Sequence, residues 1–525
     1  MKASHALFAS IALAAAAAGC AGSANPPAGS GPLGASEAPN VRAMTLPQPL
    51  SYVYAQLAFD GKRFTRVTVA CAKLNLNHGP TYTAPKSGPL RLTAAITIAP
   101  TCRPSPLPSL PPRLYVVAVR SSQIATIAGP AQIVSRPWSF TATWPGLTMV
   151  KGAQYRFFAI SYASAPWQMF HGTAVHNGYA AVAGPSSATL AWRFKAGSGT
   201  GNPPNSIAIS SAGIVYLGAP TAIYALNSAG GIVWQQPYND PQGPALSNDQ
   251  STLYFAASNA LVAVWAKTGK LIWQYTTGNK TIFGPTVAPN DTILQGSFDG
   301  YLYDIHSNGT LNWKELTAGS IAYPASVDSN GNVYLGGGDS HYGPDSNAYS
   351  FTSKGALRWK YDTTVTQVGT PAYAGGRLFV PAQPWLFSLN PATGAVVWFT
   401  PDCGAPPLLP CGTSETTGIG SPAVGADGTI YTVTDRGAVN TVNPTSGATA
   451  QIYSTGAAIP SYPLVDKNGT VYVGDTNGVM YAISKTGTLV WSYATGGSIA
   501  EASPALGADG TLYFSSQDGY LYAIR

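Results

Sequence analysis

The chain has 525 residues, which is enough for two or three domains, and only 9% of them are charged. Its 57 Gly, 43 Pro and 29 Tyr favour an all-β protein, in which turn formers separate strands rich in aromatic residues. The formal net charge of +7 is spread thinly, without a cluster of Lys or Arg of the kind that follows phosphates, and this argues against nucleic-acid binding.

The N-terminus, MKASHALFASIALAAAAAGC, has the form of an export signal over residues 1–20. Lys2 supplies the positive start, and the apolar run that follows is too short to span a bilayer comfortably. Small residues directly before Cys20 resemble the bacterial lipobox, in which the cysteine is lipidated and becomes the new N-terminus. Ala21 then favours sorting to the outer membrane. The alternative is an ordinary secretory signal with an incidental cysteine, which predicts a secreted protein.

Residues 21–47 are rich in Ala, Gly, Ser and Pro and contain few bulky apolar side chains. Such a segment cannot form a core, and we expect it to behave as a tether. Its random-coil span is about 30 Å. The tether is therefore long enough to hold a lipidated protein clear of the membrane surface.

Residues 48–164 have a different sequence pattern, in which short runs of aromatic and β-branched residues alternate with Gly or Pro turns. These runs predict a small β-sandwich. The segment WPGLTMVKGAQYRFFAIS loosely resembles the end of an immunoglobulin or fibronectin type III module, where a Leu and a Tyr (here Leu147 and Tyr155) brace the corner before a long strand. The expected strands are 51–59, 64–71, 90–98, 113–119, 138–144 and 154–163.

A repeat of about 40 residues fills the region 165–525. Each unit opens with Pro-Ala, continues through two Tyr-containing strands joined by a turn, and ends in a Gly turn and a Trp strand. The opening position is held by Ser206, Pro244, Pro285, Pro324, Pro371, Pro422, Pro463 and Pro504. The closing position is held by Trp234, Trp273, Trp313, Trp359, Trp398 and Trp491, with Tyr453 in the sixth unit.

Each unit supplies four short strands, and a lone sheet of that size has two free edges and too little core to be stable. Eight such sheets packed face to face around an axis predict a β-propeller. The eighth unit ends without its Trp strand, whereas TLAWRF (residues 189–194) precedes the first unit with no repeat attached. We therefore expect the strand of Trp192 to complete the last blade and to close the ring. The Trp residues, which recur once per blade, are expected to pack between blades.

Segments such as SPALGADGTLYFSSQDGYLYAI and LNPATGAVVW resemble the pyrroloquinoline quinone (PQQ)-like repeat family. The lead-in WQMFHGTAVHNGYAAVAGP, residues 167–185, is similar to the segment that precedes such propellers. One branch of this family is the quinoprotein dehydrogenases, which bind PQQ and calcium. The other branch contains non-catalytic propellers, such as the BamB-like outer-membrane assembly lipoproteins.

The dehydrogenase branch implies a disulfide between adjacent cysteines, acidic calcium ligands and a catalytic Asp. This chain has no adjacent cysteines, and its acidic residues lie mostly in turns. In the turns 328–332 and 466–470 a Gly stands at the fourth position and a strand follows at once, which is typical of hairpins and not of calcium loops. We therefore expect no PQQ, no calcium and no catalytic residue.

Four cysteines remain after Cys20, and an even number in an oxidising compartment predicts disulfides. We expect local pairs, Cys71 with Cys102 and Cys403 with Cys411. The spacings do not match zinc sites.

Two histidines of the lead-in, His171 and His176, have no third ligand nearby in sequence, so we expect surface or capping positions for them. Two loop insertions are candidate binding surfaces, because loops on rigid scaffolds carry recognition. Their candidate residues are His341, Tyr342 and Asp345 in the fourth unit, and Leu408 and Leu409 between the last two cysteines.

These features predict an exported, lipid-anchored binding or scaffold protein of the cell envelope without enzymatic activity. The expected partner is an envelope protein or a cell-wall or extracellular polymer, and the lipid anchor is the expected contact with the membrane. The additional domain 48–164 departs from the BamB-like pattern, so the resemblance carries the class of function and not the specific task. The alternatives are a quinoprotein oxidoreductase that binds PQQ and calcium, and a carbohydrate-binding or carbohydrate-active propeller with paired carboxylates at its axis.

Overall fold

The computed structural model describes the backbone of eight strands between residues 50 and 162, and most of the propeller region. The elements in these residues are all strands, and no helix among them is long and apolar enough to cross a membrane. The signal, the tether and all five cysteines lie outside the described residues. The described ranges of the propeller region are 166–196, 206–338, 343–365, 367–382, 384–400, 420–499 and 503–525.

The N-terminal strands form one sheet in the order β2-β1-β8-β5-β6, in which β3 also pairs with β8, and a separate pair β4-β7. All pairs in this region are antiparallel. The resemblance to an immunoglobulin or fibronectin type III module stays a prediction. The strands are β1 (Leu50–Phe59), β2 (Phe64–Val67), β3 (Tyr82–Thr83), β4 (Gly88–Thr97), β5 (Leu114–Arg120), β6 (Gln123–Ala128), β7 (Ser139–Met149) and β8 (Gln154–Tyr162).

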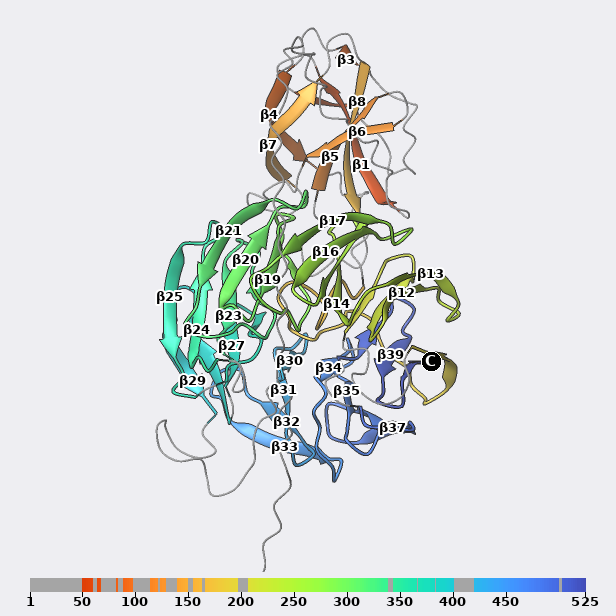
Figure 1. Cartoon of the computed structure of the whole chain (residues 1–525), viewed down its shortest axis with the longest axis vertical. Coiled ribbons are helices and arrows are strands. Elements are labelled where there is room, and N and C mark those ends of the chain that lie inside the picture. The colour runs from red at the N-terminus through yellow and green to blue at the C-terminus, as the bar shows by residue number, and fades with distance from the viewer. Residues whose placement is uncertain are drawn as a thin grey trace, which may run out of the picture. The chain divides into compact units, whose positions relative to one another are not determined.

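The C-terminal region forms eight four-stranded antiparallel sheets, which are the blades of a ring (Figure 1). Blade 1 is β10 (Ile207–Ile209), β11 (Val215–Ala219), β12 (Ala222–Leu226) and β13 (Ile232–Pro237). Blade 2 is β14 (Pro241–Leu246), β15 (Thr252–Ala257), β16 (Ala260–Trp265) and β17 (Leu271–Thr276). Blade 3 is β18 (Thr286–Val287), β19 (Ile293–Gly296), β20 (Tyr301–Ile305) and β21 (Leu311–Leu316). Blade 4 is β22 (Ser326–Val327), β23 (Val333–Gly336), β24 (Asn347–Phe351) and β25 (Leu357–Asp362).

The remaining blades have the same order of strands. Blade 5 is β26 (Ala372–Ala374), β27 (Arg377–Ala382), β28 (Trp385–Leu389) and β29 (Val396–Phe399). Blade 6 is β30 (Ala423–Val424), β31 (Ile430–Val433), β32 (Ala438–Val442) and β33 (Thr449–Ser454). Blade 7 is β34 (Leu464–Val465), β35 (Val471–Gly474), β36 (Val479–Ile483) and β37 (Leu489–Ala494). Blade 8 is β38 (Ala505–Leu506), β39 (Leu512–Ser515), β40 (Tyr520–Ile524) and β9 (Leu190–Lys195).

The core of the ring lies between the faces of neighbouring blades. The inner strands are buried on both faces, and their sequences are therefore continuous apolar runs. An example is β15, TLYFAA, in which every residue is buried. The outer strands alternate instead. In β37, Trp491 is buried, whereas Leu489 and Val490 are 41% and 45% exposed. The repeat therefore encodes blades that pack against each other and present one strand to solvent.

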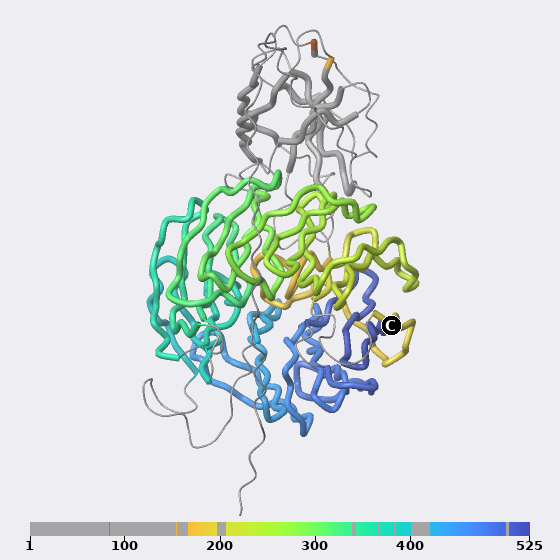
Figure 2. The backbone as a smooth tube through the Cα atoms, in the orientation of Figure 1, coloured from red at the N-terminus to blue at the C-terminus, as the bar shows by residue number. Residues whose placement is uncertain are grey.

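The two ends of the propeller meet in blade 8. The last strand, β40, pairs with β9, with Tyr520 opposite Lys195 and Ala523 opposite Trp192. The amide of Arg525 also donates a hydrogen bond to the carbonyl of Thr189. In Figure 2 the yellow β9 segment lies beside the blue C-terminal end. The prediction of an eight-bladed ring closed by non-covalent strand pairing is confirmed.

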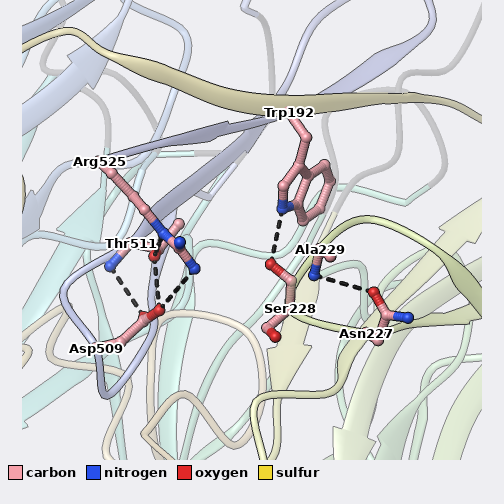
Figure 3. A network of polar contacts seen from close by, with 7 residues as sticks. All are labelled: Trp192, Asn227, Ser228, Ala229, Asp509, Thr511 and Arg525. Carbon is pink, nitrogen blue, oxygen red and sulfur yellow. Dashed lines mark hydrogen bonds and ion pairs between the residues drawn. The ribbon is translucent and has the colours of Figure 1, made fainter.

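Seven tryptophans lie at the contacts between consecutive blades. The indole N–H of each donates to a backbone carbonyl of the following blade or of the lead-in, at 2.8–3.1 Å. Figure 3 shows one such bond, from Trp192 to Ser228. The donor and acceptor pairs are Trp192–Ser228, Trp234–Ala266, Trp273–Ser307, Trp313–Ser353, Trp359–Pro391, Trp398–Pro444 and Trp491–Pro185.

A glycine of the same turn lies against the indole ring in six of these contacts. At Gly394 the φ angle is +73°, and an added Cβ would lie 2.7 Å from the ring of Trp359. Glycine is needed here both for the left-handed backbone and for the space that the ring occupies. The seventh contact, from Trp491 to blade 8, uses Pro185 because β40 and β9 of that blade are not consecutive in the sequence.

The assignment of Tyr453 to the closing position of the sixth unit is wrong. Tyr453 pairs with Val439 and contacts Tyr481 of the next blade, as Tyr493 contacts Tyr522. It is therefore the counterpart of Tyr493, which follows the closing Trp by two residues. At this joint the backbone of Ile452 lies against Gly487 of blade 7, so the contact between blades 6 and 7 has no indole.

The glycine at a tryptophan contact gives a testable prediction. Gly394→Ala and Gly376→Ala introduce the same methyl group at similar φ angles, +73° and +75°, but nothing lies within 4 Å of an added Cβ at Gly376. We expect Gly394→Ala to destabilise the propeller by about 2 kcal/mol more than Gly376→Ala, because the methyl group overpacks the Trp359 joint. Chemical denaturation of both variants measures the difference. Equal losses would contradict the packing role of this glycine.

Candidate functional site

The lead-in segment is residues 167–185, and its part 167–180 lies inside the ring and bonds to the innermost strands (Figure 2, orange). An innermost strand has an edge that faces the axis, and its amides need acceptors when they are buried. Carbonyl groups of the lead-in supply these acceptors at 2.7–2.9 Å. The amides of Ile209, Leu246, Val327, Tyr373, Val424 and Val465 donate to the carbonyls of Trp167, Gln168, Ala174, Val175, Asn177 and Gly178, in that order. The lead-in thus joins blades 1, 2, 4, 5, 6 and 7.

Aromatic side chains fill the space around this segment. Trp167 and Phe170 are 0% and 2% exposed. The ring of Phe170 packs edge-on against Tyr462, with centroids 4.8 Å apart, and lies near Phe283, which in turn contacts Tyr323. The axis of the propeller is therefore occupied by packed side chains of the chain itself.

His171 is fully buried in this channel. Its Nδ1 lies 2.9 Å from the carbonyl oxygen of His176, and its Nε2 lies 2.8 Å from that of Pro463. The two carbonyls favour the protonated ring, but burial acts more strongly and lowers the pKa of His171. The neutral ring donates to one carbonyl at a time. An added Cβ at Gly178 would lie 2.5 Å from Nε2, so the backbone packs closely on this ring.

His176 is also fully buried and reaches blades 3 and 4. Its Nδ1 lies 2.7 Å from the carbonyl of Phe170, and its Nε2 lies 2.9 Å from the hydroxyl of Thr286 and 3.1 Å from the carbonyl of Ala325. A neutral ring with its proton on Nδ1 donates to the carbonyl of Phe170, while the hydroxyl of Thr286 donates to the carbonyl of Ala325 at 2.7 Å. Burial lowers the pKa of His176 to about 4.

The expectation that these two histidines occupy surface or capping positions is wrong. Their φ angles, +54° and +46°, lie in the left-handed region, where the segment turns inside the channel. Within the described part of the chain, no group of three His, Cys, Asp or Glu side chains is placed to hold a metal ion. The arrangement is that of structural histidines which satisfy buried carbonyls.

A small cavity lies between blades 5 and 6, lined by Leu386, Thr432, Pro463 and neighbouring residues. Its volume is about 10 Å³, which is room for about one water molecule. The buried hydroxyl of Thr432 has no hydrogen-bond partner in the protein, as expected for a group that binds such a water. This cavity is too small for a substrate or an organic cofactor.

The candidate binding residue Asp345 is 3% exposed, and its carboxylate holds a turn. One oxygen accepts from the hydroxyl of Tyr349 at 2.8 Å and from the amide of Ala318, in the connection from blade 3. The other oxygen accepts from the amide of Asn347. Asp345 therefore joins two blades and is not available on the surface. The other candidate loop residues, His341, Tyr342, Leu408 and Leu409, lie outside the described residues.

Other aspartates in turns have the same role as Asp345: their carboxylates accept hydrogen bonds that hold turns and blade connections. Asp299 and Asp518 each accept from a Tyr hydroxyl and from a Gly amide of the preceding blade. Asp328 accepts from amides of its own turn, in which Gly331 has a φ of +79°. These contacts are those of hairpin turns and blade connections. The lipidation candidate Cys20 and the disulfide candidates Cys71, Cys102, Cys403 and Cys411 lie outside the described residues and stay predictions.

Large apolar side chains are exposed on the outer strands of seven of the eight blades; β33 of blade 6 has none. We call this set the apolar rim: Leu190, Ile232, Val233, Leu271, Leu311, Leu316, Leu357, Val396, Val397, Leu489 and Val490, which are 37–60% exposed. The most exposed members are Leu316 and Leu271, at 60% and 56%. Several of these side chains directly precede the buried Trp of their strand, so their positions can be identified from the sequence repeat.

The expectation that the positive charge is spread thinly is wrong. Residues 48–164 contain twelve Lys and Arg against one acidic residue, Asp60, whereas residues 165–525 contain fourteen Lys and Arg against nineteen acidic residues. The N-terminal domain thus carries a net charge of +11 and the propeller one of −5. Counting charge by domain reveals this division, which the total for the whole chain conceals.

The buried histidine gives a prediction about acid stability. The pKa of His176 is lower in the folded protein, about 4, than its ordinary value of 6.5, so the unfolded chain binds more protons below pH 6.5. The stabilisation is complete above that pH and is lost as the pH falls toward 4. His176 alone should reduce the free energy of unfolding by about 2 kcal/mol between pH 7.5 and pH 5.

Denaturation of the His176→Gln variant at both pH values tests this assignment. The variant should be less stable than the parent at neutral pH and should depend less steeply on pH. His306→Gln, at an exposed turn position, is the matched control and should keep the parent's slope. A parental slope in His176→Gln would show that this ring does not govern the acid sensitivity.

Comparison with known proteins places the fold in a family. A family model described as "Outer membrane protein assembly factor BamB" matches residues 219–347 and 382–525. A search of curated proteins gives no match. Among solved structures, BamB from Moraxella catarrhalis matches with a TM-score of 0.51 and 16% identity, over 64% of this chain and 99% of that chain.

Two dehydrogenases also share the fold. A europium-containing methanol dehydrogenase matches with a TM-score of 0.53 and 15% identity, over 66% of this chain and 89% of that chain. Quinohemoprotein alcohol dehydrogenase from Comamonas testosteroni matches with a TM-score of 0.55 and 13% identity, over 69% and 80%. These identities establish the shared propeller and no common activity. The family model covers more than half of the sequence, and the chain belongs to the PQQ-like repeat propellers described as outer membrane protein assembly factor BamB.

Proposed function

We propose that this protein is an exported binding or scaffold protein of the cell envelope, which acts through the outer surface of its propeller. The observation that carries the proposal is the occupied channel: residues 167–180 of the lead-in bond to the innermost strands of six blades, and aromatic side chains pack around them. A propeller whose axis is filled by its own chain binds partners on its outside. The family assignment supports a protein partner in the envelope.

The apolar rim supplies a surface for that partner. The outer strands of seven blades each present one or two aliphatic side chains to solvent, and exposed apolar surface of this kind supports protein association. An envelope protein fits this surface better than a polar cell-wall polymer does. Lipidation at Cys20, with an outer-membrane location facing the periplasm or the cell surface, belongs to the same proposal and rests on the N-terminal sequence.

The second candidate is a quinoprotein oxidoreductase, which is favoured by the two dehydrogenases of similar fold. PQQ with calcium needs a flat slot and a set of oxygen ligands for the cation. The described residues do not fit this group: the axis is filled around Phe170, the neighbouring cavity has a volume of about 10 Å³, and Asp299, Asp345 and Asp518 already hold blade connections. The paired carboxylates expected at the axis of a carbohydrate-active propeller are absent from the described side chains of the lead-in.

Site-specific crosslinking tests the proposed surface. A photo-crosslinking amino acid is placed in intact cells at one rim position per blade, such as Leu271, Leu357 or Leu489, with exposed Lys485 in a turn as the control. We expect positions in one or two adjacent blades to capture a defined envelope protein, because a partner covers only part of a ring. Crosslinking that is absent at all rim positions, or equal at Lys485, contradicts the proposal.

Addition of PQQ and calcium tests the alternative. A ligand that binds the folded state raises the melting temperature in proportion to its saturation. We expect the melting curve and the absorbance spectrum of PQQ to stay unchanged when the purified chain, PQQ and calcium are mixed. A saturable rise in melting temperature would establish the quinoprotein reading in place of the scaffold.

A further inference from the structure

The N-terminal domain has a charge that its neighbours do not share. It carries a net charge of +11 over residues 48–164. Such an excess attracts polyanions and repels cations over about one Debye length. The acidic partner could lie within the same chain, because the propeller carries a net charge of −5.

The carboxylates of the propeller are largely engaged within the propeller itself. Asp299, Asp328, Asp345, Asp466, Asp475 and Asp518 accept bonds from Tyr hydroxyls and from turn or connection amides. Asp509 lies 3.2 Å from Arg525 (Figure 3). These groups already hold turns and connections of the propeller in place. The partner of the basic domain is therefore expected outside this chain.

The topology places three arginines at one end of the N-terminal sheet. Arg66 of β2 stands opposite Leu57 of β1, which in turn stands opposite Phe157 of β8. Arg156 is the next residue of β8 and stands opposite Val119 of β5, directly before Arg120. The three positions thus occupy three successive rows near one end of the sheet. Because successive rows alternate between the two faces, Arg66 and Arg120 stand on one face and Arg156 on the other. With ordinary strand spacings, their Cα atoms lie within about 16 Å of one another.

We call the positions Arg66, Arg120 and Arg156 the basic end. Arginine is the side chain best suited to phosphate, because its planar group donates two parallel hydrogen bonds.

We propose that the basic end binds the anionic phospholipid headgroups of a membrane surface. The sequence predicts that residues 21–47 form a tether, with a random-coil span of about 30 Å, between this domain and the lipidation candidate Cys20. A domain tethered in this way to a bilayer would encounter its headgroups at high effective concentration. This inference rests on the envelope location proposed above and goes beyond the partner of the propeller.

Vesicle sedimentation tests the proposal with the chain from residue 21 onward, so that no acyl group contributes. Binding is measured on vesicles of phosphatidylcholine and on vesicles in which a third of it is replaced by phosphatidylglycerol. We expect binding to the anionic vesicles only, weakening steeply as salt is added. The triple variant Arg66→Gln, Arg120→Gln, Arg156→Gln should bind about a hundredfold more weakly, since each basic residue near an anionic surface contributes about a factor of five.

Two further variants keep the test decisive. Arg66→Lys, Arg120→Lys, Arg156→Lys retains the charge and should bind within a few fold of the parent, which separates a loss of charge from a loss of fold. Lys267→Gln, Lys270→Gln, Lys280→Gln removes three exposed charges from the propeller and should bind as the parent does.

Three outcomes overturn the proposal. They are equal binding to both kinds of vesicle, an equal loss in the propeller variant, and tighter binding to duplex DNA than to anionic vesicles at the same salt, which would identify the domain as a nucleic-acid binder. None of them depends on the crosslinking of the apolar rim, so failure of this inference is distinguishable from failure of the proposed function.

Discussion

The structure depends on one constraint: the innermost strands of the blades turn an edge toward the axis, and their amides need acceptors there. The lead-in supplies these acceptors through successive carbonyls, from Trp167 to Gly178, to strands that are up to about 300 residues away in the chain. The same segment continues into β9, which completes blade 8. Filling of the axis and closure of the ring are therefore consequences of one piece of chain.

The outside of the ring is joined by a second set of contacts. Each indole of an outer strand reaches the next blade, packs against its glycine turn and donates to its backbone. Blade 8 has no continuous turn for Trp491, and Pro185 at the end of the lead-in accepts that bond instead. The joint between blades 6 and 7 lacks an indole, and Ile452 occupies the space there. The ring is thus held by repeated joints with one variant, while the axis is held by a segment without repeats.

This difference explains what the sequence could and could not predict. The blades, their number, the closing strand at Trp192 and the Trp positions recur with a regular period, so self-similarity identifies them. The surroundings of His171 and His176 do not recur: their partners, such as Pro463, lie in distant blades and leave no local pattern. Tyr453 was misplaced because its blade lacks the Trp that sets the register. The role of Asp345 as a buried residue that joins two blades depends on a contact with Ala318, in the connection from the preceding blade, which the local sequence does not indicate. The uneven charge was present in the sequence but emerges only when the domains are counted separately.

The functional account follows from the filled axis. This chain occupies the centre of its propeller with Phe170, His171 and His176, which contact the blades. We therefore propose that recognition involves the apolar rim and the basic domain that precedes the propeller. The two surfaces differ in chemistry, one apolar and one cationic, and the proposed partners differ accordingly: a protein for the rim and an anionic membrane for the basic domain.

Hydrogen–deuterium exchange of the purified chain tests the central claim most directly, because it reports the protection of individual backbone segments. The account predicts that the amides of Gly178 and Ala180, and those of Val327 and Tyr373 that donate to the lead-in, exchange as slowly as the amides of the buried strand β15. Lead-in amides that exchange as fast as those of exposed turns would contradict it, and with it the argument that the propeller works from its outside.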